Sequence, residues 1–216
     1  MGNLPKFISV HVPKTAGTTF LKLISPVYGK HFKSDYLDIM NLNSVILHGD
    51  EPVNKPIPGA KKYNVIMGHF RASKYLHLKR PYVAWVRNPI DRAISHFYFW
   101  KTLWKKERKR NWDPKLSKLF EDKWTIVDFS KIFSNQMSYF LDYDIKNFKF
   151  IGISENFNDE LLRFEKIFGI KINPPKKKLN INKDKEEISK KIRDEIAKYH
   201  KKDFELYNMA LELSKS

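Results

Sequence analysis

The chain contains no cysteine among its 216 residues, which excludes disulfide bonds and thiolate metal sites. It lacks any run of the roughly 18–20 apolar residues that a membrane-spanning helix needs. The N-terminal residues also lack the apolar stretch of a signal peptide. The opening hexapeptide MGNLPK starts like a myristoylation site but places Lys6 where serine or threonine is required. We therefore expect a soluble, cytoplasmic protein.

Basic residues outnumber acidic ones by 41 to 24, which gives a formal net charge of +17. Such a surface attracts polyanions, including nucleic acid, acidic lipid, anionic glycans and phosphorylated cofactors. Solvated lysines explain much of the excess equally well, so the charge alone names no partner. Apolar residues make up 42% of the chain, enough for a core and against global disorder. The length predicts a single domain over residues 1–216.

Apolar runs alternate with helical patterns along the chain. Strands are expected at 7–12, 63–67, 82–86 and 148–153. Helices are expected at 17–28, from 88 to about 110, in pieces over 114–141, at 157–168 and at 184–213. Residues 30–62 have a weak pattern and are expected to form an irregular connection. The alternation predicts an α/β class and a P-loop-like three-layer fold, with a central, mostly parallel sheet flanked by helices.

The turn after the first predicted strand has the composition of an anion-binding loop, PKTAGTT at 13–19. Backbone N–H groups at a helix N-terminus receive anions. Gly17 permits close approach, while Thr18 and Thr19 add hydroxyl donors. In the triphosphate loop G-x-x-x-x-G-K-[ST] the lysine follows the second glycine and the hydroxyl binds magnesium. Here Lys14 precedes the glycine, and no predicted strand ends in an aspartate. The pattern favours a phosphate site without metal, and an ordinary polar turn is the alternative.

A second candidate anion site follows the strand at 82–86, in the segment RNPIDRAIS. Arg87 lies at the carboxyl end of that strand, which is the edge where open α/β sheets bind ligands. Ser95 lies two turns into the following helix, on a face that can look back towards the strand ends. Arginine grips a phosphate with two hydrogen bonds, and serine adds a donor. The alternatives are an ion pair from Arg87 to Asp91 and no special role for Ser95.

Together the two segments resemble the sulfotransferase superfamily, in particular carbohydrate enzymes related to the heparan and uronyl 2-O-sulfotransferases. PKTAGTT is similar to the loop that holds the 5′-phosphosulfate of PAPS (3′-phosphoadenosine 5′-phosphosulfate), and RNPIDRAIS to the segment that holds its 3′-phosphate. Further segments resemble the family: MGHF at 67–70, NQMSYFL at 135–141, FIGISENFNDEL at 150–161 and DFELYNMA at 203–210. The sequence departs from those enzymes in lacking a long N-terminal membrane anchor and stem.

The resemblance implies a PAPS-dependent sulfotransferase that moves a sulfuryl group to a hydroxyl acceptor, with a carbohydrate as the expected acceptor and PAP as the product. It implies that Lys14 stabilises the leaving oxygen and that Arg87 and Ser95 hold the 3′-phosphate. The 5′-phosphate would be held by amides and hydroxyls of the loop residues Thr15, Ala16, Gly17, Thr18 and Thr19. A C-terminal loop supplies three further candidate contacts to PAPS, Lys178, Asn180 and Lys183.

The acceptor hydroxyl needs a general base. His69 is the candidate, because it follows a strand end, matches the family's Gly-His segment and titrates near neutral pH. A histidine merely bonded to backbone in a turn is the alternative. Glu155 is the second candidate, although a glutamate near a helix N-terminus is ordinary and favours a structural role. His11, inside the first predicted strand, is expected to be a packed residue. No HExxH or paired-carboxylate spacing appears, so we expect no metal.

Two basic segments, 101–110 and 174–185, are candidate walls of an acceptor groove. The tryptophans in and beside the first one would either stack on sugar rings or fill the core. Two other functions stay open. A P-loop nucleotide kinase conflicts with the order of lysine and glycine in the loop. A noncatalytic polyanion- or nucleic-acid-binding protein has the net charge in its favour, without an aromatic RNA-binding pattern or zinc-finger spacing.

Overall fold

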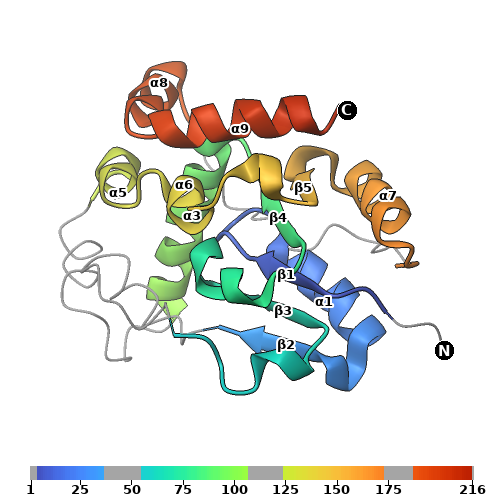
Figure 1. Cartoon of the computed structure of the whole chain (residues 1–216). Coiled ribbons are helices and arrows are strands. Elements are labelled where there is room, and N and C mark those ends of the chain that lie inside the picture. The colour runs from blue at the N-terminus through green and yellow to red at the C-terminus, as the bar shows by residue number, and fades with distance from the viewer. Residues whose placement is uncertain (1–3, 37–54, 107–123, 173–186, 216) are drawn as a thin grey trace.

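The architecture comes from a computed structural model, which describes residues 4–36, 55–106, 124–172 and 187–215 (Figure 1). Several predicted residues lie outside the described ones, namely Lys178, Asn180, Lys183, the whole basic segment 174–185, the end of 101–110 and Trp112, the tryptophan just after that segment.

Five parallel strands form one sheet in the order β2-β3-β1-β4-β5 (Figure 1). Their bounds are Phe7–Val10 for β1, Phe32–Asp35 for β2, Val65–Gly68 for β3, Tyr82–Val86 for β4 and Phe150–Ile153 for β5. The predicted α/β class with a parallel sheet is therefore confirmed.

The strand β2 was not predicted from the sequence. The expectation of an irregular connection over residues 30–62 is therefore wrong for the residues of β2. β2 lies at the edge of the sheet, and none of its four residues is fully buried. An edge strand that buries little surface lacks the apolar pattern that identifies central strands. β2 ends at Asp35, an aspartate at a strand end that the sequence did not predict, and its carboxylate accepts hydrogen bonds from Lys74 and Tyr75.

The described helices are α1 (Gly17–Tyr28), α3 (Pro89–Lys106), α5 (Ile126–Ile132), α6 (Gln136–Phe140), α7 (Phe157–Phe168), α8 (Lys190–Lys198) and α9 (Lys201–Leu213). A 3₁₀ segment, η4, covers Ala72–Leu78. The single C-terminal helix predicted at 184–213 is wrong within the described part, because α8 ends at Lys198 and α9 starts at Lys201. The buried side chain of His200 lies at the break.

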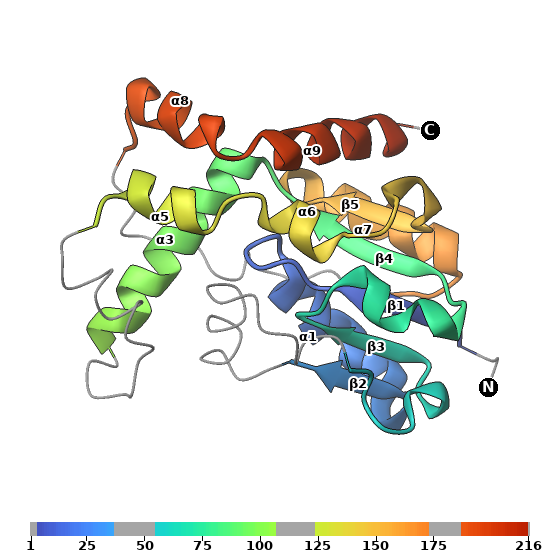
Figure 2. The ribbon, with the colours of Figure 1, turned by 60° about the vertical axis from the view of Figure 1, so that its left-hand side comes forward.

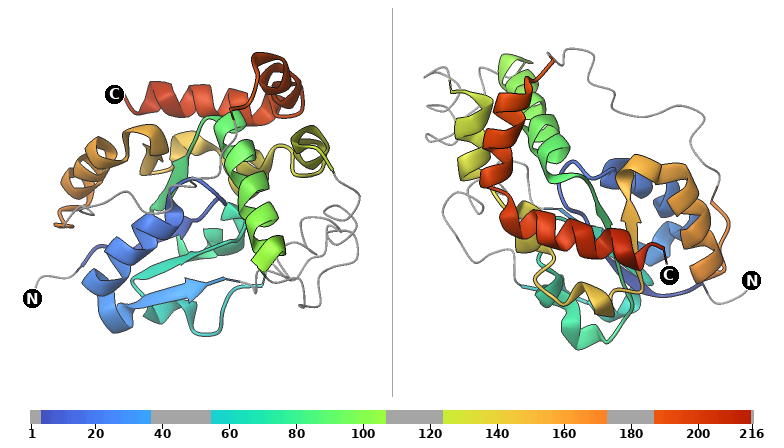
Figure 3. Two further views of the ribbon diagram at one scale, coloured as in Figure 1. Left: turned by 180° about the vertical axis from the view of Figure 1, so that it is seen from behind. Right: turned by 90° about the horizontal axis from the view of Figure 1, so that it is seen from above.

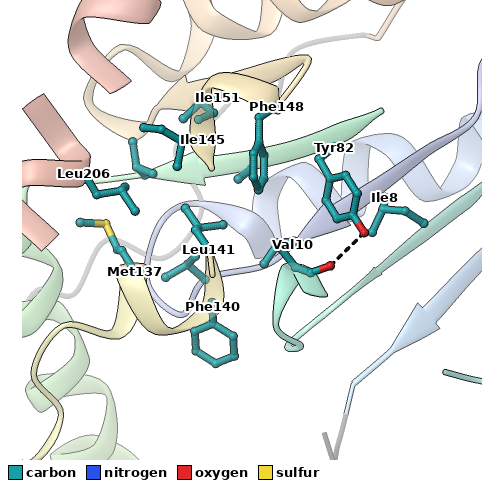
Figure 4. Packing of buried hydrophobic residues seen from close by; sticks show 14 of the residues in the cluster. Ile8, Val10, Tyr82, Met137, Phe140, Leu141, Ile145, Phe148, Ile151 and Leu206 are labelled. Carbon is teal, nitrogen blue, oxygen red and sulfur yellow. Dashed lines mark hydrogen bonds between the residues drawn. The ribbon is translucent and has the colours of Figure 1, made fainter. Parts of the chain in front are cut away.

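Side chains alternate between the two faces of the sheet, as the pleat of a strand requires. Along β4, Tyr82, Ala84 and Val86 enter one core cluster, while Val83 and Trp85 enter the other. The first cluster is closed by η4, α6 and α9, and Figure 4 shows part of its packing. The second is closed by α1 and α7, and α1 lies in front of the strands in the view from behind (Figure 3, left). These three layers match the predicted arrangement.

The helices α3, α5 and α8 form a third apolar cluster to one side of the sheet (Figure 2). Trp100 is buried in it and Trp104 packs against it, so the core interpretation of these two tryptophans is the one the structure supports. His96 is also buried here and accepts a hydrogen bond from Trp100 Nε1 at 2.7 Å. The side chains of this part of α3 therefore build the core.

A buried ion pair ties α3 to α9 and α6. The side chains of Arg92 and Asp203 are fully buried, with Arg92 Nε 3.8 Å from Asp203 Oδ2. Asp203 Oδ1 also accepts hydrogen bonds from the backbone N–H and the hydroxyl of Ser138, at 2.8 and 2.9 Å. Burial alone would raise the pKa of Asp203, but the imidazole of His200, the charge of Arg92 and the backbone amides lower it below its usual value. Arg92, Ser138 and Asp203 come from three of the segments that resemble the family.

We expect Asp203→Ala to lower the free energy of unfolding by about 3–5 kcal/mol, because it leaves the Arg92 charge buried without its carboxylate. Urea unfolding measures the loss. The matched control is Asp91→Ala, which removes a half-exposed pair with Arg193 at 2.9 Å and should cost less than about 1 kcal/mol. Equal losses in the two variants would contradict the assigned importance of the buried pair.

Candidate active site

The carboxyl end of β1 is a topological switch point of the sheet. β1 pairs with β3 on one side and with β4 on the other, and the chain visits β2 and β3 before it crosses to β4 and β5. In open α/β sheets a crevice for ligands forms at such a point, outside the carboxyl ends of the strands. The loop between β1 and α1 begins there.

This loop has an unusual backbone for residues other than glycine. Lys14 has a φ of 69° and Ala16 a φ of 68°, both in the left-handed region. Such residues cost about 1–3 kcal/mol each and cluster at functional sites. The Thr15 hydroxyl donates to the carbonyl of Val12 at 2.9 Å and fixes the turn. Left-handed residues in a turn help to aim successive N–H groups into one concavity, which is the property that an anion site needs.

The three threonines of the loop are not equivalent. Thr15 is buried and its hydroxyl proton is already donated to Val12, so the structure gives that hydroxyl a structural role. Thr19 is buried, and its backbone N–H bonds to the carbonyl of Ala16 at 2.9 Å as α1 begins. Thr18 is exposed at the N-terminus of α1. Of the predicted hydroxyl donors, Thr18 is therefore the one that the structure leaves accessible.

Gly17 is required by the packing of His11. A Cβ atom at position 17 would lie 1.9 Å from His11 Cδ2 and 2.2 Å from His11 Nε2. Distances this short cannot be accommodated without moving the ring. The sequence favoured glycine for the close approach of an anion, and the structure adds a second reason, which is that the imidazole occupies the space.

The two predicted anion segments meet at the backbone of Lys14. Arg87 Nη1 donates to the Lys14 carbonyl at 3.4 Å. The alternative partner of Arg87, Asp91, pairs with Arg193 instead. The half-buried Ser95 lies two turns into α3. The contact between Arg87 and Lys14 brings the loop and the β4–α3 junction into one site.

Phe99 contacts Lys14 of the loop, a contact that the sequence motifs did not predict. Lys14 Nζ lies 4.2 Å from the centre of the Phe99 ring, in a cation–π contact. Phe99 follows Ser95 by four residues on α3, so the two share one face of that helix. This spacing is the signal from which the contact could have been anticipated.

The ring of His69 is held in one tautomer by a backbone carbonyl. Its Nδ1 lies 2.6 Å from the carbonyl oxygen of His11, and because a carbonyl only accepts, Nδ1 must carry the proton. The neutral ring therefore has its lone pair on Nε2. Burial lowers the pKa of His69 to about 4, although the hydrogen bond to His11 acts in the opposite direction. The ring is bonded to backbone, as the structural alternative expected. The same bond leaves the lone pair on Nε2, but the expectation that His69 titrates near neutral pH is wrong, because burial lowers its pKa.

The second candidate base, Glu155, has a structural partner. Its exposed carboxylate accepts the backbone N–H of Asn88 at 2.7 Å, just before α3 begins. Glu155 therefore supports the β4–α3 junction. The sequence had suggested a different structural role for it, at the start of α7. This contact favours the structural interpretation of Glu155.

The sequence matches the family model described as "Sulfotransferase family" over residues 3–210, so the chain belongs to the sulfotransferase family. Among solved structures it is similar to mouse sulfotransferase SULT7A1 complexed with PAP, at 17% identity and a TM-score of 0.45, over 78% of this chain and 59% of the mouse chain. It is also similar to a sulfotransferase from Alicyclobacillus acidocaldarius, at 13% identity and a TM-score of 0.40, over 94% and 93% of the two chains. No curated protein matches the sequence.

Two further features concern metals and membranes. Within the described ranges, no cluster of three or more His, Cys, Asp or Glu residues is placed to hold a metal ion. Of the helices that the structure describes, none is long and apolar enough to cross a membrane.

We expect the free energy of unfolding to decrease as the pH is lowered from about 7 to about 5, because four histidines are held neutral in the fold. Burial, as the largest cause in each case, lowers the pKa of His11, His69, His96 and His200. Unfolded histidines titrate near 6.5. The unfolded state therefore binds more protons below that pH, and this contribution to stability is fully present only above it.

Urea midpoints measured across this range test the expectation. The variant His96→Gln should show a shallower pH dependence than the parent protein. The exposed His31 provides the matched control, and His31→Gln should leave the slope unchanged. A midpoint that does not move between these pH values would contradict the assignment of neutral buried histidines.

Proposed function

We propose that this protein transfers a sulfuryl group from PAPS to a hydroxyl acceptor and releases PAP. One observation carries the proposal, which is the contact from Arg87 to the Lys14 carbonyl at the switch point of the sheet. It unites two phosphate-binding segments whose separate sequences resemble the donor site of the family. Membership of the sulfotransferase family supports the reaction class. In this proposal one catalytic domain spans residues 1–216.

The loop at 13–19 would hold the 5′-phosphosulfate through backbone N–H groups at the start of α1, where the helix dipole favours an anion. Arg87 and Ser95 would hold the 3′-phosphate, the group that distinguishes PAPS from ADP and ATP. Donor specificity then depends on the β4–α3 junction more than on the loop. The predicted independence from metal stays a prediction.

In the transfer step, His69 Nε2 takes the proton of the acceptor hydroxyl as its oxygen bonds to sulfur. The bond from sulfur to the bridging phosphate oxygen breaks, and Lys14 stabilises the negative charge that develops on that oxygen. The attacking and leaving oxygens are in line, as in phosphoryl transfer. Phe99 contacts the Lys14 ammonium with its ring face and can steady it near the loop.

A carbohydrate is the acceptor that we propose. The similarity to the 2-O-sulfotransferases supports it, and the net charge of +17 suits an anionic chain. The same charge is the one feature in favour of a noncatalytic polyanion-binding protein. A kinase has less support, because the lysine precedes the glycine of the loop.

We expect Arg87→Ala to weaken PAP binding by roughly 10- to 150-fold, the equivalent of losing charge-assisted hydrogen bonds worth about 1.5–3 kcal/mol. Binding of ADP, which has no 3′-phosphate, should change little. Calorimetric titration with both nucleotides gives the two affinities. Arg80→Ala is the matched control, because Arg80 donates to the carbonyls of Tyr63 and Lys61, at the amino end of β4. A parallel loss of ADP and PAP affinity would remove the assigned role of Arg87.

We expect His69→Ala to lower kcat by roughly 10²- to 10⁴-fold, because proton abstraction from the acceptor is lost. PAP affinity should stay nearly intact. The assay follows labelled sulfate from PAPS to a panel of uronic-acid and neutral oligosaccharides, with His77→Ala on the surface as the control. If kcat survives in His69→Ala, the base lies elsewhere, and Glu155→Gln is the next variant to measure.

A further inference from the structure

We propose that His11 and Tyr36 are positioning residues that hold the imidazole of His69 with Nε2 directed at the acceptor, an inference that rests on His69 being the base in the proposed function. Neither residue is part of the motifs that suggested the function. His11 was expected to be a packed residue, and Tyr36 follows a strand that the sequence did not predict.

The three residues form one row across the carboxyl edge of the sheet. The register of the strands pairs Gly68 of β3 with Asp35 of β2 and with Val10 of β1. The next residue on each of these neighbouring strands is aromatic, in the order Tyr36, His69 and His11. The fold therefore places a phenol and two imidazoles side by side at the switch point.

The three rings are all in mutual contact. His11 Nδ1 lies 2.7 Å from the hydroxyl oxygen of Tyr36. The rings of His11 and His69 are in tilted contact, with centroids 4.4 Å apart and an interplanar angle of 32°. The rings of Tyr36 and His69 are nearly perpendicular, with centroids 4.9 Å apart and an interplanar angle of 86°. Each ring is thus restrained by the other two.

Both outer members of the row are anchored. Tyr36 follows Asp35, whose Oδ2 accepts from Lys74 Nζ at 2.7 Å and from the Tyr75 hydroxyl at 2.8 Å. On the other side, the His11 ring abuts the backbone of Gly17. The hydroxyl of Tyr36 then fixes the remaining rotation of the His11 ring, and the His11 ring in turn fixes the plane of His69.

The row also keeps His11 neutral next to the base. Burial, followed by the charges of His69 and Lys14, lowers the pKa of His11 well below its usual value. A neutral His11 lets His69 accept a proton without a second imidazolium stacked upon it. Burial raises the pKa of Tyr36, so its hydroxyl stays protonated and bonds to the His11 ring in either tautomer.

The variant Tyr36→Phe tests the proposal, because it removes the hydroxyl and keeps the ring. We expect kcat to fall roughly 10- to 100-fold through misplacement of the base, with unchanged PAP affinity and donor KM. Nitrogen-15 NMR of the imidazoles should show His69 as a single Nδ1–H tautomer in the parent protein. In the variant it should show a mixture, because the displaced ring no longer keeps its hydrogen bond to the His11 carbonyl. The matched control is Tyr28→Phe, which deletes another buried hydroxyl, the one that donates to the Pro5 carbonyl at 3.0 Å.

A rescue experiment separates positioning from simple packing. The amide of His11→Asn can still bond to the Tyr36 hydroxyl, whereas His11→Leu cannot. We expect His11→Asn to retain more kcat than His11→Leu. In the His11→Leu background, the further change Tyr36→Phe should have no additional effect, because the hydroxyl acts through the imidazole.

The inference is overturned if Tyr36→Phe keeps both the kcat and the single His69 tautomer of the parent protein, as Tyr28→Phe should. The NMR readout does not depend on turnover. If the parent protein transfers no sulfuryl group, a tautomer change confined to the Tyr36 and His11 variants still supports the positioning of the His69 ring, while the proposed reaction fails. Circular dichroism of each variant confirms that it is folded before either readout is interpreted.

Discussion

The site depends on how His11 is fixed at the carboxyl end of β1. Its backbone N–H bonds to the carbonyl of Gly68 at 2.8 Å and extends the contact between β1 and β3 by one residue. Its carbonyl accepts a hydrogen bond from Nδ1–H of His69, and its ring fills the space beside Gly17. One residue thus links His69, the proposed general base, to the predicted anion loop. Any change in the register of β1 would alter both at once.

The charged residues in and behind the site form two groups. Lys14 and Arg87 face the switch point, where the proposed donor would bring several negative charges. Behind them, the buried pair of Arg92 and Asp203 holds α3 against α9 and α6. A buried pair of this kind adds little net stability but is costly to break. Its role here is to fix the helix that carries Ser95 and that places Phe99 against Lys14.

Much of the fold could be predicted from the sequence, because four of the five strands are buried on both faces and appear as continuous apolar runs. β2 could not, since an edge strand with half-exposed residues has no such run. The break between α8 and α9 could not be predicted, because Ile192, Ile196 and Tyr199 keep a helical spacing up to the residues where α8 ends. The loop, Arg87 and His69 were predicted from local motifs. The contacts of Tyr36 and the His11 ring depend on strand register, which no local pattern encodes, whereas the place of Phe99 follows from its four-residue spacing to Ser95 on α3.

The central claim is that one site holds both the 5′- and the 3′-phosphate of the donor. The most direct measurement is calorimetric titration of the protein with adenosine 3′,5′-bisphosphate, ADP and ATP–magnesium, each with and without a chelator. The account predicts that the bisphosphate binds most tightly and that removing the metal does not change its affinity. Tighter binding of ATP–magnesium, or equal binding of all three nucleotides, would contradict it.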